Sequence, residues 1–339
     1  MAATPDRRTA LLNLEAALTP YVSQVTEELK KYIGPAREPK ELYDAVRHLF
    51  DAGGKRLRPV MCLLSAQAVG GDATEVLPYA AAIEMTHVFT LIHDDIMDKS
   101  PLRRGVPTVH TKFGESTAML AGDTLSALAF ETLARVNIPA ELHREIAKEF
   151  AGLIKEICEG QTLDLRFEGQ RRIDELTYFH MAERKTATLY EIGMKHGAMI
   201  AGGDVILAKK LAEAGRLIGL AFQLWDDCLD VTGQSAQTGK PQNLDIFAGK
   251  KTLITVFAMD KLDPMDRRLL IDLLAKKDKN EADIKAVLKL FEKSGAIKLA
   301  QEKAKSFTSH AKSALQSLVP SNARNLISEI ADFATSRDK

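Results

Sequence analysis

The pattern of hydrophobic and polar positions predicts helix along almost the whole chain. The alternation of Val, Ile and Thr with polar residues that marks strands is absent, and no Asn-Gly or Asp-Gly pair signals a hairpin. The roughly 100 residues between Pro139 and Pro241 contain no proline and are rich in Ala, Leu, Glu, Lys and Met, which long helices favour. The sequence therefore predicts an all-α protein.

Glycine-containing turns separate the expected helices. We expect helices over residues 7–32, 39–52, 58–69, 74–98, 107–112, 116–136, 139–161, 174–200, 206–232, 250–260, 264–276, 279–294, 296–317 and 320–335. No low-complexity linker divides them, so we expect a single domain over residues 1–339, in which residues 1–40 form an N-terminal helical extension. Residues 232–249 are the longest polar, glycine-containing stretch and are expected to form a mobile flap.

Composition and charge exclude several classes of protein. The 339-residue chain carries 46 Lys and Arg against 46 Asp and Glu, so it lacks the basic excess of a nucleic-acid-binding protein. With 45% hydrophobic residues it is not a disordered chain either. No apolar run reaches the roughly 18 residues of a membrane span, and we expect no secretory signal. The three cysteines, Cys62, Cys158 and Cys228, follow no metal-binding spacing, so we expect reduced thiols in a cytoplasmic protein.

Two aspartate clusters are the most informative feature of the sequence. The segments HDDIMD and WDDCLD both follow the pattern DDxxD near the C-terminal end of an apolar helix, and their carboxylates are those of Asp94, Asp95, Asp98, Asp226, Asp227 and Asp230. Residues four apart lie on one face of a helix, so like charges face each other at a cost of roughly a few tenths of a kcal/mol per pair. The alternative interpretation is that both clusters are solvated helix ends. The negative end of the helix dipole disfavours acidic residues at a C-terminus, which argues against it. The clusters therefore predict a cation, and hard oxygen ligands suit Mg²⁺ joined to a phosphate.

Two other polar residues share the faces that carry these clusters. At 100° per residue, His87 lies within about 30° of the direction of Asp94 and Asp98, and Gln223 lies within the same angle of Asp226 and Asp230. A single histidine is more often an ordinary core or surface residue. Two turns from a metal-phosphate cluster, a contact to phosphate is the better interpretation of His87.

Basic residues supply the complement of the carboxylates. Lys55, Arg56 and Arg58 follow a Gly-Gly turn just before a helix, where backbone amides and cationic side chains make an anion site. Further basic candidates are Arg103, Arg104, Lys185, Lys240, Lys250 and Lys251. Any one basic pair alone would be interpreted as solvated surface. Beside two predicted metal sites, the whole set predicts a cavity that binds more than one diphosphate.

Taken together, these motifs resemble the trans-isoprenyl diphosphate (polyprenyl) synthase family, from about Leu42 to Thr255. The matching segments, in family order, are GGKRLRP (53–59), LIHDDIMDKSPLRRG (91–105), GQTLD (160–164), RKTATL (184–189), GLAFQLWDDCLD (219–230) and GKPQNLDIFAGKKT (239–252). The resemblance implies an isoprenoid synthase-like bundle of mostly antiparallel helices around a deep central cavity, in a homodimer. It also implies a transferase that condenses isopentenyl diphosphate with an allylic diphosphate.

The resemblance further implies roles for residues at matching positions. Those expected to bind Mg²⁺, as about three ions with substrate bound, are Asp94, Asp95, Asp98, Asp226, Asp227 and Asp230. Those expected to hold the allylic diphosphate are Arg103, Lys185, Thr186, Gln223, Lys240 and Lys250. Those expected to hold the diphosphate of isopentenyl diphosphate are Lys55, Arg58, His87 and Arg104. Gln161 and Asp164 would support them, and the expected catalytic residues are Asp94, Asp98, Asp226 and Lys185.

The chemistry of such a reaction agrees with these residue types. Ionisation of an allylic C–O bond separates a carbocation from a diphosphate anion, which metal ions and cationic side chains stabilise. A flap over residues 232–249 would exclude the water that quenches the cation. No residue stands out as a dedicated base, and the resemblance implies that the released diphosphate takes the proton.

The residues just before the first aspartate cluster bear on product length. In the family, the fourth and fifth residues before the motif form part of the floor of the hydrocarbon pocket, and here they are Thr90 and Phe89. This pair resembles geranylgeranyl diphosphate synthases of the archaeal type, which implies a C20 product. Alternatively, Phe89 is an ordinary core residue, and Ile83 or Met119 forms the floor of the pocket. The alternative products are C15, or C25 and longer.

Two functions outside this class remain as alternatives. A class I terpene cyclase also carries a first DDxxD, but its second metal motif normally uses Asn, Ser or Thr, and Glu, and it has no use for a segment such as GGKRLRP. A non-catalytic partner subunit would be expected to have lost some of the aspartates, whereas all six are present.

Overall fold

The computed structural model describes residues 7–34, 36–233 and 242–337. Its internal contacts divide the chain into two compact units, which we describe separately. Unit 1 comprises Met1–Ala151, Leu189–Glu213 and Ala314–Ile330, and unit 2 comprises Gly152–Thr188, Ala214–Ser313 and Ala331–Lys339. The expected single domain over residues 1–339 stays a prediction.

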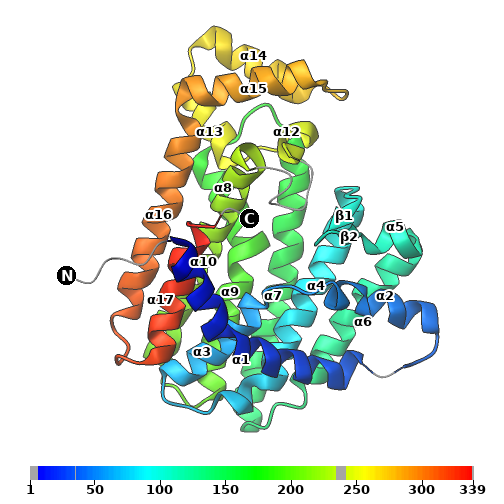
Figure 1. The fold of residues 1–339 in the computed structure, drawn as a ribbon, viewed down its shortest axis with the longest axis vertical. Helices are drawn as coiled ribbons and strands as arrows, with labels where there is room; N and C mark the ends of the chain where they lie inside the picture. Colours follow the sequence, from blue (N-terminus) through cyan, green and yellow to red (C-terminus); the bar gives the residue numbers. More distant parts are fainter. Residues whose placement is uncertain (1–6, 35, 234–241, 338–339) are drawn as a thin grey trace. The chain divides into compact units, whose positions relative to one another are not determined.

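Helices form nearly all of the secondary structure in the described residues (Figure 1). In chain order they are α1 (Arg7–Ile33), α2 (Lys40–Asp51), α3 (Leu57–Ala68), η1 (Ala73–Val76), α4 (Leu77–Met97), α5 (Val109–Phe113), α6 (Glu115–Leu133), α7 (Ala140–Glu168), α8 (Glu175–Ala182), η2 (Glu183–Ala187), α9 (Thr188–Ile200), α10 (Val205–Thr232), α12 (Leu244–Ala248), α13 (Leu253–Lys261), α14 (Pro264–Ala275), α15 (Glu281–Ser294), α16 (Ala296–Leu315) and α17 (Asn322–Ala334). The prediction of an all-α protein is confirmed. No helix among these residues is long and apolar enough to cross a membrane.

In unit 1, α4 makes its most extensive contact with α6. Both helices contribute small or aliphatic side chains that are fully buried, among them Ile83 on α4 and Ala121 on α6. The two helices approach closely near the first aspartate cluster, because a Cβ at Gly122 would lie only 2.2 Å from Nε2 of His93. The same nitrogen lies 3.1 Å from the carbonyl oxygen of Met119, so His93 fixes the end of α4 against α6.

A short hairpin follows α4 and was not expected from the sequence. Strands β1 (Leu102–Arg103) and β2 (Val106–Pro107) pair antiparallel, with Leu102 opposite Pro107 and Arg103 opposite Val106 (Figure 1). The two residues between the strands, Arg104 and Gly105, have φ of 54° and 76°. Two consecutive positive φ values are those of a type I′ turn, which matches the twist of a hairpin. The turn directs Arg104 away from the strands and back toward α2.

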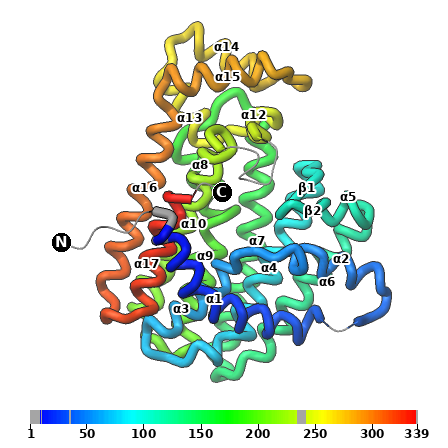
Figure 2. The backbone as a smooth tube through the Cα atoms, in the orientation of Figure 1, coloured from blue at the N-terminus to red at the C-terminus, as the bar shows by residue number. Residues whose placement is uncertain are grey.

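In unit 2, two clusters of buried side chains form the core. One cluster gathers residues of α12 to α16 around Ile254, Val287 and Phe291. In the other, residues of α8, α10 and α13 meet around Tyr178 and Leu224. Figure 2 traces α14 and α15 lying side by side, as their contacts require. Asp263 caps α14 at the amides of Met265 and Asp266 and stabilises its first turn.

Two of the expected helices and the expected flap differ from the structure. Helix α7 continues to Glu168 rather than ending at residue 161, so the segment GQTLD is helical. The expected helix over residues 174–200 is interrupted by the π-helical segment η2. Of the expected flap over residues 232–249, residues 234–241 lie outside the described residues, and a short helix, α12, follows them.

Candidate active site

The first aspartate cluster lies at the C-terminal end of α4. Asp98 is the residue that caps the helix, and its amide donates to the carbonyl oxygen of Asp94 at 2.8 Å. This i to i+4 bond confirms that Asp94 and Asp98 lie one turn apart on one face of the helix. Asp98 is exposed and Asp94 is half-buried. Both carboxylates therefore have access to solvent at the end of the helix.

The middle residue of the cluster has a different environment. Asp95 is fully buried and accepts hydrogen bonds from Nε of Arg103 at 2.8 and 2.7 Å. Nη2 of Arg103 lies 2.7 Å from the same carboxylate, so the contact engages the guanidinium through two nitrogens. The hairpin positions Arg103 for this contact, because β1 begins only a few residues after α4 ends. Asp95 thus fixes the direction of Arg103.

The segment GGKRLRP contains the fixed guanidinium of Arg56, and its Gly-Gly turn contacts a second guanidinium, that of Arg104 from the hairpin. Arg56 takes a positive φ of 49° at the start of α3, and its Nη1 donates to Oε1 of Glu84 at 2.7 Å in a buried ion pair. Nη1 of Arg104 donates to the carbonyl oxygens of Leu49, at 2.8 Å, and of Gly53. A Cβ at Gly54 would lie 2.9 Å from the guanidinium carbon of Arg104, so this glycine makes room for the side chain. Burial lowers the pKa of Arg104 to about 10.

His87 lies among these basic groups. Nη1 of Arg58 donates to Nε2 of His87 at 3.1 Å, and the guanidinium of Arg58 also lies 4.4 Å from the ring centroid of Tyr190. Burial, followed by the charges of Arg58 and Arg104, holds the pKa of His87 well below its usual range. The imidazole is therefore neutral at pH 7. Lys55, from the same segment, is exposed.

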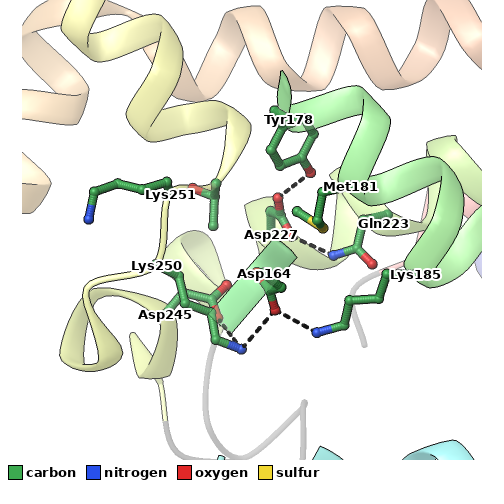
Figure 3. A pocket seen from close by; sticks show the side chains of 10 residues that line it. Asp164, Tyr178, Met181, Lys185, Gln223, Asp227, Asp245, Lys250 and Lys251 are labelled. Carbon is green, nitrogen blue, oxygen red and sulfur yellow. Dashed lines mark hydrogen bonds and ion pairs between the residues drawn. The ribbon is translucent and has the colours of Figure 1, made fainter. Parts of the chain in front are cut away.

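Unit 2 contains a pocket in which residues from each of the later motifs meet (Figure 3). Its lining residues come from α7, α8, η2, α10, α12 and the segment after α12: Asp164, Tyr178, Met181, Lys185, Gln223, Asp227, Asp245, Lys250, Lys251 and Thr252. The structure thus brings together Lys185, Gln223 and Lys250, which the sequence analysis assigned to one diphosphate. The pocket is lined by both ammonium and carboxylate groups.

Two lysines converge on one carboxylate in this pocket. Nζ of Lys185 lies 2.6 Å from Oδ2 of Asp164, and Nζ of Lys250 lies 3.8 Å from the same oxygen and 3.9 Å from Oδ1 of Asp245 (Figure 3). Burial acts to raise the pKa of Asp164, but Lys185 and Lys250 outweigh it and lower that pKa. Asp164 is therefore ionised at neutral pH. It holds the two ammonium groups within one pocket.

The close approach of α7 and η2 makes this arrangement possible. A Cβ at Gly160 would lie 2.3 Å from the backbone nitrogen of Lys185, so only glycine fits at that position of α7. A π-helical segment carries an extra residue in a turn and is common at functional sites, because it re-aims the side chains it contains. Here it contains Lys185 and Thr186.

The second aspartate cluster lies on α10, and its middle residue is again buried. Tyr178 donates to Oδ2 of Asp227 at 2.7 Å, and Nε2 of Gln223 donates to Oδ1 at 2.9 Å (Figure 3). Thr186 donates in turn to Oε1 of Gln223 at 2.6 Å. Burial, with Asp245 nearby, raises the pKa of Asp227 well above its usual range. This chain of hydrogen bonds fixes Thr186 and Gln223 relative to each other.

The outer residues of the second cluster make other contacts. Oδ1 and Oδ2 of Asp230 accept hydrogen bonds from the amides of Leu244 and Asp245, at 3.0 and 3.1 Å, and so fix the start of α12. Oδ1 of Asp226 lies 2.7 Å from Nη2 of Arg337. The sequence analysis did not single out Arg337, Tyr178 or Asp245. Lys240 lies outside the described residues. Gln161 is buried on α7, and neither of its amide atoms has a hydrogen-bond partner among the residues that the structure describes.

Mg²⁺ fits the donor set that these clusters provide. The carboxylates of Asp94, Asp98, Asp226 and Asp230 are hard oxygen ligands of the kind that Mg²⁺ prefers. Within the described part of the chain, no three His, Cys, Asp or Glu side chains are grouped closely enough to hold a metal ion by themselves. Mg²⁺ does not require such a group, because it usually keeps several waters and combines one or two carboxylates with the phosphates of a substrate.

Comparison with known proteins places these features in a family. The model of the polyprenyl synthetase family matches residues 39–291. A geranylgeranyl diphosphate synthase of Methanosarcina mazei is 40% identical over 304 residues, which are 90% of this chain and 92% of that protein. A geranylfarnesyl diphosphate synthase of Natronomonas pharaonis is 38% identical over 96% of this chain and 98% of its own length. The crystal structure of a geranylgeranyl pyrophosphate synthetase from Pyrococcus horikoshii has a TM-score of 0.91 and 38% identity, covering 96% of this chain and 99% of that one.

These similarities extend over nearly the full length of each protein. The expected resemblance to trans-isoprenyl diphosphate synthases is confirmed, and with it the all-α isoprenoid synthase fold and the enzyme class. The matched residues 39–291 include both aspartate clusters, the hairpin arginines and the lysines of the unit 2 pocket. The chain belongs to the polyprenyl synthetase family.

Proposed function

We propose that the protein condenses isopentenyl diphosphate with an allylic diphosphate and forms geranylgeranyl diphosphate, a C20 product. The observation that carries this proposal is the meeting of Lys185, Lys250 and Gln223 around Asp164 and Asp227 in one pocket of unit 2. Cationic and amide groups of this kind bind a diphosphate. The relative from Methanosarcina mazei, named as a geranylgeranyl diphosphate synthase, supports the same substrate class.

The residues would form two sets, one for each substrate. In unit 1, Lys55, Arg58, His87 and Arg104 would bind the diphosphate of isopentenyl diphosphate, and the Arg58 to His87 hydrogen bond supports this set. The allylic diphosphate would be bound by Arg103, Lys185, Thr186, Gln223, Lys240 and Lys250. The hydrogen bond from Thr186 to Gln223 holds two of these side chains in a fixed relation.

Mg²⁺ would be held by Asp94, Asp98, Asp226 and Asp230 together with the allylic diphosphate. When bound, it acts as a Lewis acid that stabilises the negative charge of the departing diphosphate. Asp95 and Asp227 would assist by orientation, since each is buried and bonded to a side chain of the diphosphate set: Arg103 for Asp95 and Gln223 for Asp227. Lys185 would stabilise the leaving diphosphate as a fixed cation. The departed diphosphate would take the proton released when the new alkene forms.

We propose Phe89 and Thr90 as residues that limit product length. Phe89 is buried on α4, with its ring edge-on to His93 at a centroid distance of 5.2 Å. The next residue, Thr90, has a small side chain, whose hydroxyl donates to the carbonyl oxygen of His87 at 2.8 Å. A C25 product is the second candidate, because the relative from Natronomonas pharaonis is named as a geranylfarnesyl diphosphate synthase.

Three further properties belong to the proposal. A homodimer is supported by exposed apolar side chains on α6, namely those of Met119, Leu120 and Phe130. A cytoplasmic location is supported by the three cysteines, all of which are free thiols. A part for residues 242–249, the described end of the expected flap, in covering the second cluster is supported by the hydrogen bonds from the start of α12 to Asp230.

One experiment decides the function and the product. The purified protein is incubated with Mg²⁺, isopentenyl diphosphate and, in separate reactions, dimethylallyl, geranyl or farnesyl diphosphate, and the products are sized by chromatography. We expect a C20 product from each primer. A main product of C25 would favour the second candidate, and no elongation of any primer would overturn the proposed function.

A further inference from the structure

The C-terminal segment of unit 2 fixes one arginine beside the second aspartate cluster. Nη2 of Arg337 lies 2.7 Å from Oδ1 of Asp226 and donates to the carbonyl oxygen of Phe222 at 3.1 Å. Its guanidinium carbon lies 4.7 Å from the ring centroid of Phe222. The indole of Trp225 donates to the backbone carbonyl of Arg337 at 2.9 Å. Phe222, Trp225 and Asp226 all lie on α10.

The two members of the ion pair differ in burial. The side chain of Arg337 is 12% exposed, whereas that of Asp226 is 59% exposed. The ring of Phe222 and the backbone contacts hold Arg337 in place independently of Asp226. The guanidinium is therefore a pre-positioned positive charge, and the carboxylate that it contacts stays open to solvent. The contact joins Arg337 to a residue proposed as a metal ligand.

We propose that Arg337 is a built-in counter-ion of Asp226 that holds this carboxylate before metal binding and competes with Mg²⁺ for it. This inference rests on the proposed function, in which Asp226 binds Mg²⁺. Asp226 lies one turn from Asp230 on α10, so a fixed cation lowers the repulsion between these two carboxylates. An ion pair with an exposed member is weak, so Mg²⁺ arriving with a diphosphate can replace it.

The competition is measured by metal binding rather than by turnover. Mn²⁺, used in place of Mg²⁺, is titrated into the full chain in the presence of inorganic diphosphate, and free Mn²⁺ is followed by electron paramagnetic resonance. We expect Arg337→Gln to bind Mn²⁺ about two- to fivefold more tightly than the wild type. Arg337→Lys, which keeps the charge, should show a smaller change. Lys312→Gln is the matched control, because it removes a cation from the ion pair with Asp332 at 2.7 Å, also near the C-terminus.

The outcomes separate this inference from the proposed function. Equal affinity in Arg337→Gln would show that the pair does not compete, and weaker affinity would show that Arg337 aids diphosphate binding; either result overturns the inference alone. If Asp226→Asn binds Mn²⁺ as tightly as the wild type, the metal assignment and this inference both fail. The emission of Trp225, the single tryptophan of the chain, checks that the C-terminal segment still lies on α10 in each variant.

Discussion

Lys185 on η2 contacts Asp164 on α7 at 2.6 Å, although the two residues lie 21 positions apart in the sequence. Lys250 approaches the same carboxylate oxygen to 3.8 Å from a different segment. Two ammonium groups are thereby held close together. Their mutual repulsion is unfavourable unless an anion lies between them. Asp164 supplies that anion in the protein itself. A bound diphosphate would add to it, since an ammonium group has three hydrogen-bond donors.

Removal of this carboxylate is expected to destabilise unit 2. Asp164→Asn leaves two largely buried ammonium groups with less compensating charge, and we expect a loss of about 3 kcal/mol in the free energy of unfolding. The pKa of Asp164 is lowered in the folded state, so its contribution is present above its unfolded pKa of about 3.9 and is lost as the pH falls through the folded value. Urea unfolding at pH 7 and near pH 3.5 should therefore show a difference between wild type and variant that shrinks in acid. A difference independent of pH would contradict this assignment.

Gly160 is expected to control the contact between α7 and η2. Gly160→Ala places a Cβ 2.3 Å from the backbone nitrogen of Lys185, so the helix must move away and the Asp164 to Lys185 contact is strained. We expect a loss of stability of about 2 kcal/mol and a large loss of turnover. Gly152→Ala is the matched control on the same helix, because among the described residues no atom beyond the neighbouring backbone of α7 lies within 4 Å of its new Cβ. Its free energy of unfolding, measured by thermal unfolding, should rise by up to about 1 kcal/mol from helix propensity alone. Similar behaviour of the two variants would contradict the packing argument.

Both DDxxD clusters are expected to be essential for turnover. Asp94→Ala and Asp226→Ala each remove a carboxylate proposed to bind Mg²⁺, and we expect activity to be lost while the helical circular dichroism is kept. Asp272→Ala, at an exposed position of α14, is the control and should leave activity unchanged. Near-normal turnover in both cluster variants would remove the metal assignment.

His87 is expected to take up a proton when a diphosphate binds. Burial and the neighbouring arginines hold its pKa well below the usual 6.5, and a bound anion offsets part of that charge and raises the pKa. The depressed pKa also means that His87 burial costs no stability above about pH 6.5 and destabilises the fold as the pH falls below it. Calorimetry of inorganic diphosphate binding near pH 6, in two buffers of different ionisation enthalpy, measures the uptake. The uptake should fall in His87→Gln, and an equal uptake in that variant would assign the proton elsewhere.

The sequence was sufficient where a feature depends on local periodicity. The spacing of Asp94 and Asp98 predicted one helical face, and the Asp98 to Asp94 backbone hydrogen bond confirms it. Lys185 and Lys250 were candidates from their charge, but their grouping with Asp164 followed only from the family resemblance, because the three share no period along the chain. Their meeting depends on the room that Gly160 leaves, which becomes visible only when the two helices are packed.

Other features left no signal that the sequence analysis could use. The hairpin turn is Arg-Gly rather than Asn-Gly, and Arg104 keeps its positive φ with its guanidinium bonded to the carbonyl oxygens of Leu49 and Gly53. A π-helical segment has no hydrophobic period that separates it from an α-helix over five residues. Arg337 is a lone basic residue that reaches Asp226 from 111 positions away. Such a contact depends on the course of the whole chain.

Phe89 is expected to limit the length of the product. Its ring is buried against His93, which is itself fixed to α6 through the carbonyl oxygen of Met119, so truncation opens a space that the backbone does not easily fill. We expect Phe89→Ala to lengthen the main product by at least one C5 unit, as measured by chromatography of the dephosphorylated alcohols. Phe130→Ala, which removes a partly exposed ring from α6 of the same unit, is the control and should leave product length unchanged. An unchanged distribution in Phe89→Ala, with helical content retained, would make Phe89 an ordinary core residue and move the limit to another side chain of the pocket.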